Sequence, residues 1–246
     1  MKIIKNILAR IFALWAIIIF ISSMLLIYIP FLITGLWSEP KKTYLFINLS
    51  RVWMKIFFTL TGVRRVFKGR ENFAQGENYI VLCNHNTFMD VPLSSPGIPG
   101  ANKTIAKIEM ARIPLFGILY KRGSVLVDRK SEESRKASFN KMKEVLQLGM
   151  HMCIYPEGTR NKTKEPLQRF HDGAFRLAVD TGHSIMPVLL FNTSIVLPNN
   201  KSFYYWPTKV EMHFLEPVPV GSLTAEQLKE KIFTLMKEYY VQHKDQ

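Results

Sequence analysis

The sequence is poor in cysteine and lacks the short motifs of several enzyme classes. Its two cysteines, Cys83 and Cys153, belong to no CxxC pair and to no histidine-rich stretch. They therefore predict buried thiols in a reducing compartment and argue against disulfides. No H-E-x-x-H motif and no G-x-S-x-G motif occurs. The sequence thus predicts no metal site and no serine nucleophile of the α/β-hydrolase kind.

Acidic residues are also scarce, because 33 Lys and Arg stand against 19 Asp and Glu, which gives a net charge of +14. Such a charge favours an anionic partner: nucleic acid, an acidic membrane surface or a phosphorylated substrate. Residues 1–65 carry nine Lys or Arg and one acid, Glu39, within the most apolar part of the chain. Basic residues that flank apolar runs are typical of helices at anionic membranes, whereas nucleic-acid binders carry basic patches with exposed aromatics. We therefore expect membrane lipids, and no nucleic acid, as partners.

Charged residues are absent altogether from residues 11–37. At about 1.5 Å per residue this run would extend over roughly 40 Å, more than the ~30 Å hydrocarbon core of a bilayer. It is too long for the apolar core of a signal peptide, and no small-residue cleavage site follows it. We therefore expect residues 11–37 to enter a membrane.

A second apolar stretch, residues 44–66, alternates bulky apolar side chains with cations such as Arg51 and Lys55. It fits either an amphipathic helix in the membrane interface or a core-facing helix of a soluble domain. Because Pro30 can kink the first segment, a re-entrant helix pair and a single span followed by a surface helix are both open. The composition predicts membrane-anchoring helices in residues 1–66 and an α/β domain in residues 67–246.

Beyond about residue 70, short β-branched runs alternate with helical stretches, which predicts an α/β sheet with some antiparallel pairing. The predicted strands are residues 79–83, 104–108, 124–127, 151–155, 185–190 and 210–215. The predicted helices are residues 131–148, 173–181 and 224–242. The last of these begins with a capping box formed by Thr224 and Gln227.

The most informative polar pair is His85 and Asp90, which follow the predicted strand at 79–83. An imidazole takes up a proton near neutral pH, and a nearby carboxylate fixes its tautomer. Residues five apart face different ways on a continuous helix, so the two can meet only if His85 lies in a turn and Asp90 begins the next helix. Thr87 and Pro92 permit such a helix start. A purely structural His–Asp pair is the alternative.

Two further blocks end in arginine after predicted strands, one at Arg129 and the other at Glu157-Gly158-Thr159-Arg160. Strand ends of an α/β sheet converge on one rim, where ligands bind. Two guanidinium groups, the Thr159 hydroxyl and the Gly158 N–H therefore predict a phosphate site. Glu157 would hold an arginine or bind a substrate hydroxyl, and a simple ion pair with Arg129 or Arg160 is the alternative.

Together these blocks resemble the glycerolipid acyltransferase family, closest to its 1-acylglycerol-3-phosphate acyltransferases. The blocks are Asn84-His85-x4-Asp90, residues 123–129, Tyr155-Pro156-Glu157-Gly158-Thr159-Arg160 and residues 185–189. The resemblance covers about residues 78–190 and implies a single mixed-sheet α/β domain with an N-terminal membrane-embedded helical segment. It further implies that His85 is the general base and that Arg129, residues 157–160 and Lys107 bind the substrate.

The resemblance also implies a reaction, in which a fatty acyl group passes from acyl-CoA or acyl carrier protein to lysophosphatidic acid and gives phosphatidic acid. No cofactor is expected beyond that acyl donor. One departure concerns His171 and Asp172, which stand where similar enzymes often have lysine. Another lysolipid or glycerol 3-phosphate as acceptor, and a noncatalytic binder of anionic lipids, therefore stay open. The expected location is the cell inner membrane, with the catalytic domain facing the cytoplasm.

Overall fold

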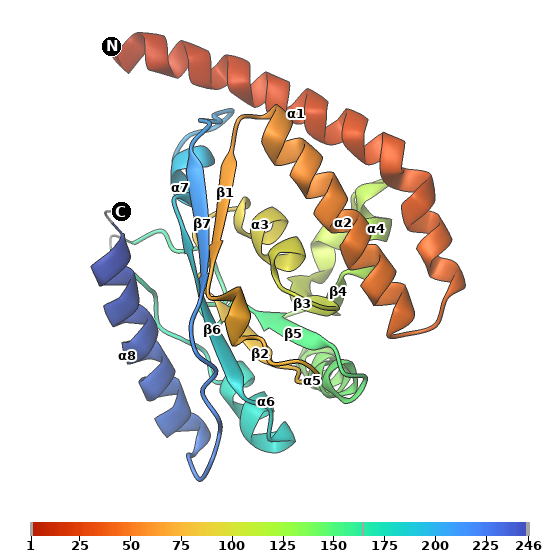
Figure 1. Ribbon diagram of the computed structural model, residues 1–246, viewed down its shortest axis with the longest axis vertical. Helices are drawn as coiled ribbons and strands as arrows, with labels where there is room; N and C mark the ends of the chain where they lie inside the picture. Colours follow the sequence, from red (N-terminus) through yellow and green to blue (C-terminus); the bar gives the residue numbers. More distant parts are fainter. Residues whose placement is uncertain (1, 164, 245–246) are drawn as a thin grey trace.

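Seven strands form one mixed sheet at the centre of the computed structural model, which describes residues 2–163 and 165–244 (Figure 1). The strand order is β1-β7-β6-β2-β5-β3-β4. The strands are β1 (Arg64–Lys68), β2 (Ile80–Cys83), β3 (Asn102–Lys107), β4 (Ser124–Val127), β5 (His151–Ile154), β6 (Ile185–Phe191) and β7 (Lys209–Phe214). Neighbouring strands run parallel, apart from the antiparallel pair β6 and β7. The predicted mixed α/β sheet is confirmed.

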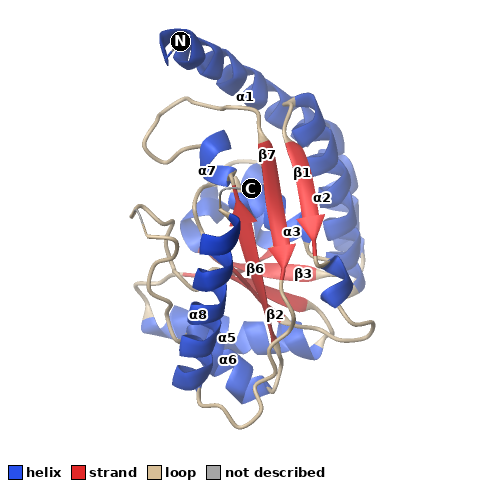
Figure 2. Cartoon of the chain, turned by 60° about the vertical axis from the view of Figure 1, so that its left-hand side comes forward, coloured by secondary structure: helices blue, strands red, loops and turns tan. Residues whose placement is uncertain are grey.

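Helices cover both faces of this sheet (Figures 1 and 2). One face carries α1 (Lys2–Ile33), α2 (Lys41–Leu60), α3 (Asp90–Gly97) and α4 (Phe116–Arg122). The other carries α5 (Glu132–Gln147), α6 (Gly173–Thr181) and α8 (Ala225–His243), while the short α7 (Thr193–Val196) follows β6. Alternate residues of β2 serve the two faces: Val81 and Cys83 join the buried cluster beneath α1–α3, and Ile80 and Leu82 join the cluster beneath α5, α6 and α8.

The predicted strands and helices beyond residue 70 are confirmed, with ends that differ by at most two residues. The capping box of α8 is present, because the Thr224 hydroxyl accepts from the Gln227 N–H and the Gln227 side chain accepts from the Thr224 N–H. Ser131 caps α5 in the same manner by accepting from the Ser134 N–H at 3.1 Å. Local capping chemistry thus fixes these helix starts from the sequence alone.

The prediction of one continuous helix over residues 44–66 is wrong at its C-terminal end. Gly62 adopts φ +73°, and the Val63 N–H donates to the Phe58 carbonyl at 2.8 Å, so α2 ends there in a Schellman-type turn. The following residues form β1, an edge strand that pairs with β7. This strand crosses the expected domain boundary at residue 66, and the two-domain division stays a prediction.

The two N-terminal helices pack side by side and are fastened to the sheet domain (Figure 1). The Trp53 indole N–H donates to the Ser23 hydroxyl at 3.0 Å, which joins α2 to α1. The Arg51 guanidinium donates to the carbonyls of Ile98 and Gly100 at 2.7 and 2.6 Å, which joins α2 to the loop after α3. Buried Trp53 and its neighbours support the core-facing interpretation of α2. Residues Lys2–Leu36 form one helix that is long and apolar enough to cross a membrane.

Candidate active site

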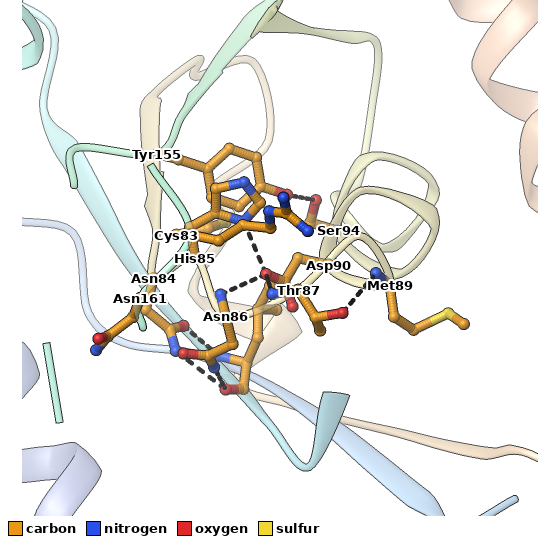
Figure 3. A network of polar contacts seen from close by, with 12 residues as sticks. Cys83, Asn84, His85, Asn86, Thr87, Met89, Asp90, Ser94, Tyr155 and Asn161 are labelled. Carbon is orange, nitrogen blue, oxygen red and sulfur yellow. Dashed lines mark hydrogen bonds and ion pairs between the residues drawn. The ribbon is translucent and has the colours of Figure 1, made fainter. Parts of the chain in front are cut away.

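His85 and Asp90 meet as the turn-then-helix geometry predicts (Figure 3). His85 lies in the turn after β2, Asp90 is the first residue of α3, and the Nδ1–Oδ2 distance is 2.8 Å. The same Asp90 oxygen accepts from the backbone N–H groups of Asn86 and Thr87 at 2.6 and 2.7 Å. Because Asp90 is fully buried and holds Nδ1, the other ring nitrogen, Nε2, is left to act on a ligand.

The backbone of His85 is fixed on both sides. Its N–H donates to Glu157 Oε1 at 2.7 Å, and its carbonyl accepts from the Asn161 N–H at 2.6 Å. The second Glu157 oxygen accepts from the Gln168 N–H at 2.8 Å. Burial raises the pKa of Glu157 to about 7, although both N–H bonds oppose that shift. Glu157 thus joins the backbone at His85 to the backbone at Gln168. The sequence suggested an arginine or a substrate hydroxyl as its partner and did not indicate these backbone contacts.

Tyr155 lies beside the imidazole ring of His85, with ring centroids 4.3 Å apart and an interplanar angle of 31°. Its hydroxyl shares a 2.7 Å hydrogen bond with the Ser94 hydroxyl of α3, and its ring is buried (Figure 3). The pKa of Tyr155 is raised by burial, so the phenol stays neutral. Sequence reasoning treated Tyr155 only as the start of a motif, because nothing in the sequence indicates that it lies beside the histidine.

A cavity of about 1260 Å³ connects these residues to the N-terminal helices. Six of the eight predicted site residues line it: His85, Lys107, Arg129, Gly158, Thr159 and Arg160. Asp90 and Glu157 stand behind this lining and contact His85 instead. Because β2, β3, β4 and β5 are parallel, their carboxyl ends bring these residues to one edge of the sheet.

The cationic side chains of this cavity form no ion pairs with the acidic residues that the structure describes. Among residues 2–163 and 165–244, no carboxylate lies within ion-pair distance of Lys107, Arg129, Arg160 or Lys162, all of which line the cavity. Arg129 donates to the Gly158 carbonyl, while Arg160 donates to Asn199 at 3.1 Å and lies over the Phe88 ring. The ion pair considered for Glu157 is thus absent from the described part of the chain. Four cations without an ion pair in this part of the chain make the lining suited to an anionic ligand.

The turn that follows β5 requires glycine at position 158. Gly158 has φ +69°, and a Cβ there would lie 2.7 Å from the His171 ring. The Thr159 hydroxyl and N–H point to no hydrogen-bond partner in the parts of the chain that the structure describes. They are therefore free to contact a ligand in the cavity.

The two residues that depart from the family pattern lie in different surroundings. His171 packs against Gly158, and its N–H donates to the Pro156 carbonyl at 2.8 Å. Asp172 pairs with Lys229 of α8 at 2.7 Å, which lowers the pKa of its carboxyl group. Only His171 therefore borders the turn that carries Thr159 and Arg160.

The apolar part of the cavity is formed by the N-terminal helices. Small residues of α1, Ala13 and Ala16, leave room beside the larger side chains of α2, including Trp53 and Phe57. From the sequence we expected the first segment to enter a membrane and the second to lie in the interface or to face the core, and we placed neither in the site. Their contribution to the cavity depends on how α1 and α2 pack on the sheet, and no local sequence signal carries that information.

The two cysteines lie behind the site as buried free thiols, as predicted. The Cys83 and Cys153 sulfur atoms are 4.0 Å apart, and burial raises the pKa of Cys83 well above its usual value. In the described ranges, no group of three or more His, Cys, Asp or Glu side chains is arranged to hold a metal ion.

Comparison with known proteins gives a consistent result. A family model described as "Acyltransferase" matches residues 64–190. The 1-acyl-sn-glycerol-3-phosphate acyltransferase of Helicobacter pylori is 31% identical over 198 residues, which cover 79% of this chain and 80% of that protein. The Borreliella burgdorferi protein of the same name is 33% identical over 147 residues, which cover 59% of this chain and 58% of that protein. The match thus spans less than two thirds of the Borreliella protein.

Among solved structures, a similar chain is the 1-acyl-sn-glycerophosphate acyltransferase of Thermotoga maritima. The two chains are 24% identical and superpose with a TM-score of 0.77, with coverage of 98% of this chain and 97% of the other. At this identity the likeness is one of fold. It includes the N-terminal helices, because nearly the whole chain is covered.

Proposed function

This chain belongs to the acyltransferase family, and on that premise we propose that it transfers a fatty acyl group to the sn-2 hydroxyl of lysophosphatidic acid. The product would be phosphatidic acid. The observation that carries the proposal is one cavity lined by His85, by cations that form no ion pair among the described residues, and by apolar side chains of α1 and α2. Such a cavity matches a ligand with one phosphate and one acyl chain.

The Asp90-oriented imidazole supports a direct transfer mechanism. His85 Nε2 takes the proton from the acceptor hydroxyl, and the oxygen attacks the thioester carbonyl carbon. The C–S bond then breaks, and the leaving thiolate receives the proton back from the imidazolium. The Asn86 and Thr87 N–H groups are occupied by Asp90, so they are not available to stabilise the oxyanion.

Arg129, Arg160, Lys107 and Thr159 are proposed to bind the phosphate of the acceptor, because they line the cavity and the three cations form no ion pair among the described residues. Glu157 is proposed to act on the substrate indirectly, by holding the backbone of His85. The acyl donor is proposed to be acyl-CoA or acyl carrier protein. Since both are soluble, the catalytic domain would face the cytoplasm from the cell inner membrane, with α1 as the membrane-associated element.

A radiolabel transfer assay on detergent-purified protein tests this function. The protein receives acyl-CoA or acyl carrier protein as donor, together with lysophosphatidic acid, other lysophospholipids or glycerol 3-phosphate as acceptor. We expect transfer to lysophosphatidic acid, and a raised KM for this acceptor in Arg129→Ala. Absence of transfer to every acceptor by folded protein would exclude the enzymatic function and favour a noncatalytic lipid binder. Faster transfer to another acceptor would keep the chemistry and change the substrate.

A further inference from the structure

Two exposed apolar side chains lie at loop positions with unfavourable backbone geometry. Leu115, before α4, has φ +60° and ψ −58°, and the Phe116 N–H donates to the Pro114 carbonyl at 2.6 Å across it. This is a γ-turn with positive φ, a rare and strained conformation. Phe203, in the loop between α7 and β7, has φ +50°. Bulky residues seldom adopt positive φ, so both tips carry strain.

Both side chains stay about half exposed despite this strain, and Phe203 also lines the cavity. Leu115 and Phe203 are each 48% exposed. Ile113 and Ile118 beside Leu115 are exposed as well. A bulky apolar side chain that stays half exposed on a strained backbone indicates a binding surface, because contact with an apolar partner would remove the exposed part from water.

Both tips are attached to α1, on either side of the cavity. The Tyr205 N–H, two residues after Phe203, donates to the Ala9 carbonyl at 3.1 Å. At the other end, the Tyr28 hydroxyl donates to the Leu115 carbonyl at 3.4 Å. Ala9 and Tyr28 are roughly 28 Å apart along the helix at 1.5 Å per residue. Between them, Ile17 and Ile21 of α1 are exposed and also line the cavity, so they form part of its mouth.

Basic side chains lie near both tips, beside the acidic Glu109 that precedes Leu115. Lys201 lies over the Tyr204 ring beside Phe203, and Lys5 lies over the ring of Trp206. Arg112 and Lys121 flank Leu115 in sequence and have no carboxylate within ion-pair distance among the residues described. Aromatic and basic side chains at the rim of an apolar surface match the headgroup region of an anionic bilayer.

We propose that the tips at Leu115 and Phe203 insert into one leaflet of an anionic membrane, on either side of α1, and hold the mouth of the cavity at the lipid surface. This inference rests on the membrane association that is part of the proposed function. It assigns a membrane-contact role to two loops of the α/β domain, in addition to the N-terminal helix. The exposed apolar face of α1 continues between the two tips, so all three elements contact the same lipid surface.

Site-specific fluorescence tests the insertion without an activity assay. Leu115→Cys and Phe203→Cys each receive an environment-sensitive fluorophore, and the native cysteines are too buried to react. The positive control is Leu26→Cys on α1, a position that is 81% exposed. The negative control is Lys136→Cys on α5, on the opposite face of the sheet, where the side chain is 76% exposed. The probe membrane is a vesicle of phosphatidylglycerol and phosphatidylcholine, with and without brominated acyl chains.

We expect a blue shift and bromine quenching at positions 115, 203 and 26, and neither at position 136. A response at position 26 without one at 115 and 203 would overturn the proposal while leaving membrane association intact. A response at both tips only after addition of acyl carrier protein would overturn it in favour of a protein contact. No response at any position would overturn membrane association as well.

Glycine variants give a second readout that does not depend on labels. Leu115→Gly and Phe203→Gly remove the side chain and accept positive φ without strain, so each variant should fold with an unchanged or higher Tm. Each should partition about tenfold or more less strongly into the anionic vesicles, since one buried apolar side chain is lost. Val179→Ala, at an exposed apolar position on α6, is the matched control and should partition like the wild type. Unchanged partitioning of both glycine variants would contradict the insertion.

Discussion

The two faces of the sheet are both covered by helices, but they differ in what those helices enclose. The face under α1–α4 carries a large buried cluster that surrounds the cavity with His85 at its edge. The face under α5, α6 and α8 carries a second cluster, in which Phe175 and Leu177 of α6 are fully buried. The difference indicates a division of labour, in which one face holds the ligand and the other stabilises the strands that position the site.

The strongest test of this division is the loss of the proposed base. His85→Ala should reduce kcat by about 10²- to 10⁴-fold, the usual contribution of a positioned general base. The Tm should also fall, because the buried Asp90 carboxylate loses the imidazole as one of its three partners, so kcat is compared at a temperature where both proteins are folded. Transfer assays and thermal unfolding in detergent measure the two effects, with His183→Ala as a control outside the cavity lining. Wild-type turnover in His85→Ala would show that the proton acceptor lies elsewhere.

The opposite face should show the reverse pattern. Phe175→Ala removes a fully buried ring beneath α6 and should lower the free energy of unfolding by about 3–5 kcal/mol. The activity per folded molecule should stay unchanged, since Phe175 does not line the cavity. Chemical denaturation and active-protein titration separate the two quantities. Val179→Ala on the same helix is exposed and should change stability by only about 0.5 kcal/mol. A large fall in kcat for Phe175→Ala would contradict the division between the faces.

The sequence predicted one face of this comparison better than the other. The helices α5 and α8 carry capping residues and a helical period, so their bounds followed from local chemistry. The contact between His85 and Asp90 also followed, because a spacing of five allows only one turn-then-helix arrangement. The cavity was not predictable, since it depends on how α1 and α2 pack against strands more than 20 residues away in sequence.

Glu157 shows the same limit within a motif. Its position before Gly158 and Arg160 drew attention to charge pairing, which is the common role of a carboxylate beside arginines. In the structure both of its oxygens are occupied by N–H groups of the backbone, one of them 72 residues distant in sequence. A motif identifies which residues matter, whereas their partners depend on the tertiary fold. The strand β1 was not predicted for a similar reason, because the strand with which it pairs, β7, lies at the other end of the chain.

A buried histidine tests whether the cavity face of the sheet also contributes to stability at the amino ends of the strands, away from the site. His151, at the start of β5, accepts from the Tyr79 N–H through Nδ1, and burial lowers its pKa to about 4. The unfolded chain then binds more protons than the folded one between pH 6.5 and 4, so stability is lost as the pH falls through this window. The loss should approach about 3 kcal/mol at pH 4. His151→Gln should remove this part of the slope in chemical denaturation at several pH values. An unchanged slope would assign the titration to another group.

The smallest effect on activity is expected from a substitution of Glu157, which joins the backbone of His85 to that of Gln168. As a carboxylate it accepts from both the His85 and the Gln168 N–H groups, whereas a protonated or amidated side chain offers one acceptor oxygen fewer. Glu157→Gln should therefore lower kcat by about tenfold, the cost of one weakened hydrogen bond to a charged group.

The pH dependence of this variant separates a positioning role from a merely structural one. Because the pKa of Glu157 is raised to about 7, the folded protein binds more protons than the unfolded chain between pH 4.5 and 7, and stability falls as the pH rises through this window. Above pH 7 the ionised side chain can accept from both backbone N–H groups. The ratio of wild-type to Glu157→Gln activity should thus be about 10 above pH 8 and approach 1 near pH 6, as the wild-type side chain becomes protonated. Matched pH–rate profiles of the two proteins measure this ratio. A constant ratio across the range would mean that the carboxylate does not titrate there, and the contact to His85 would then be independent of the charge of Glu157.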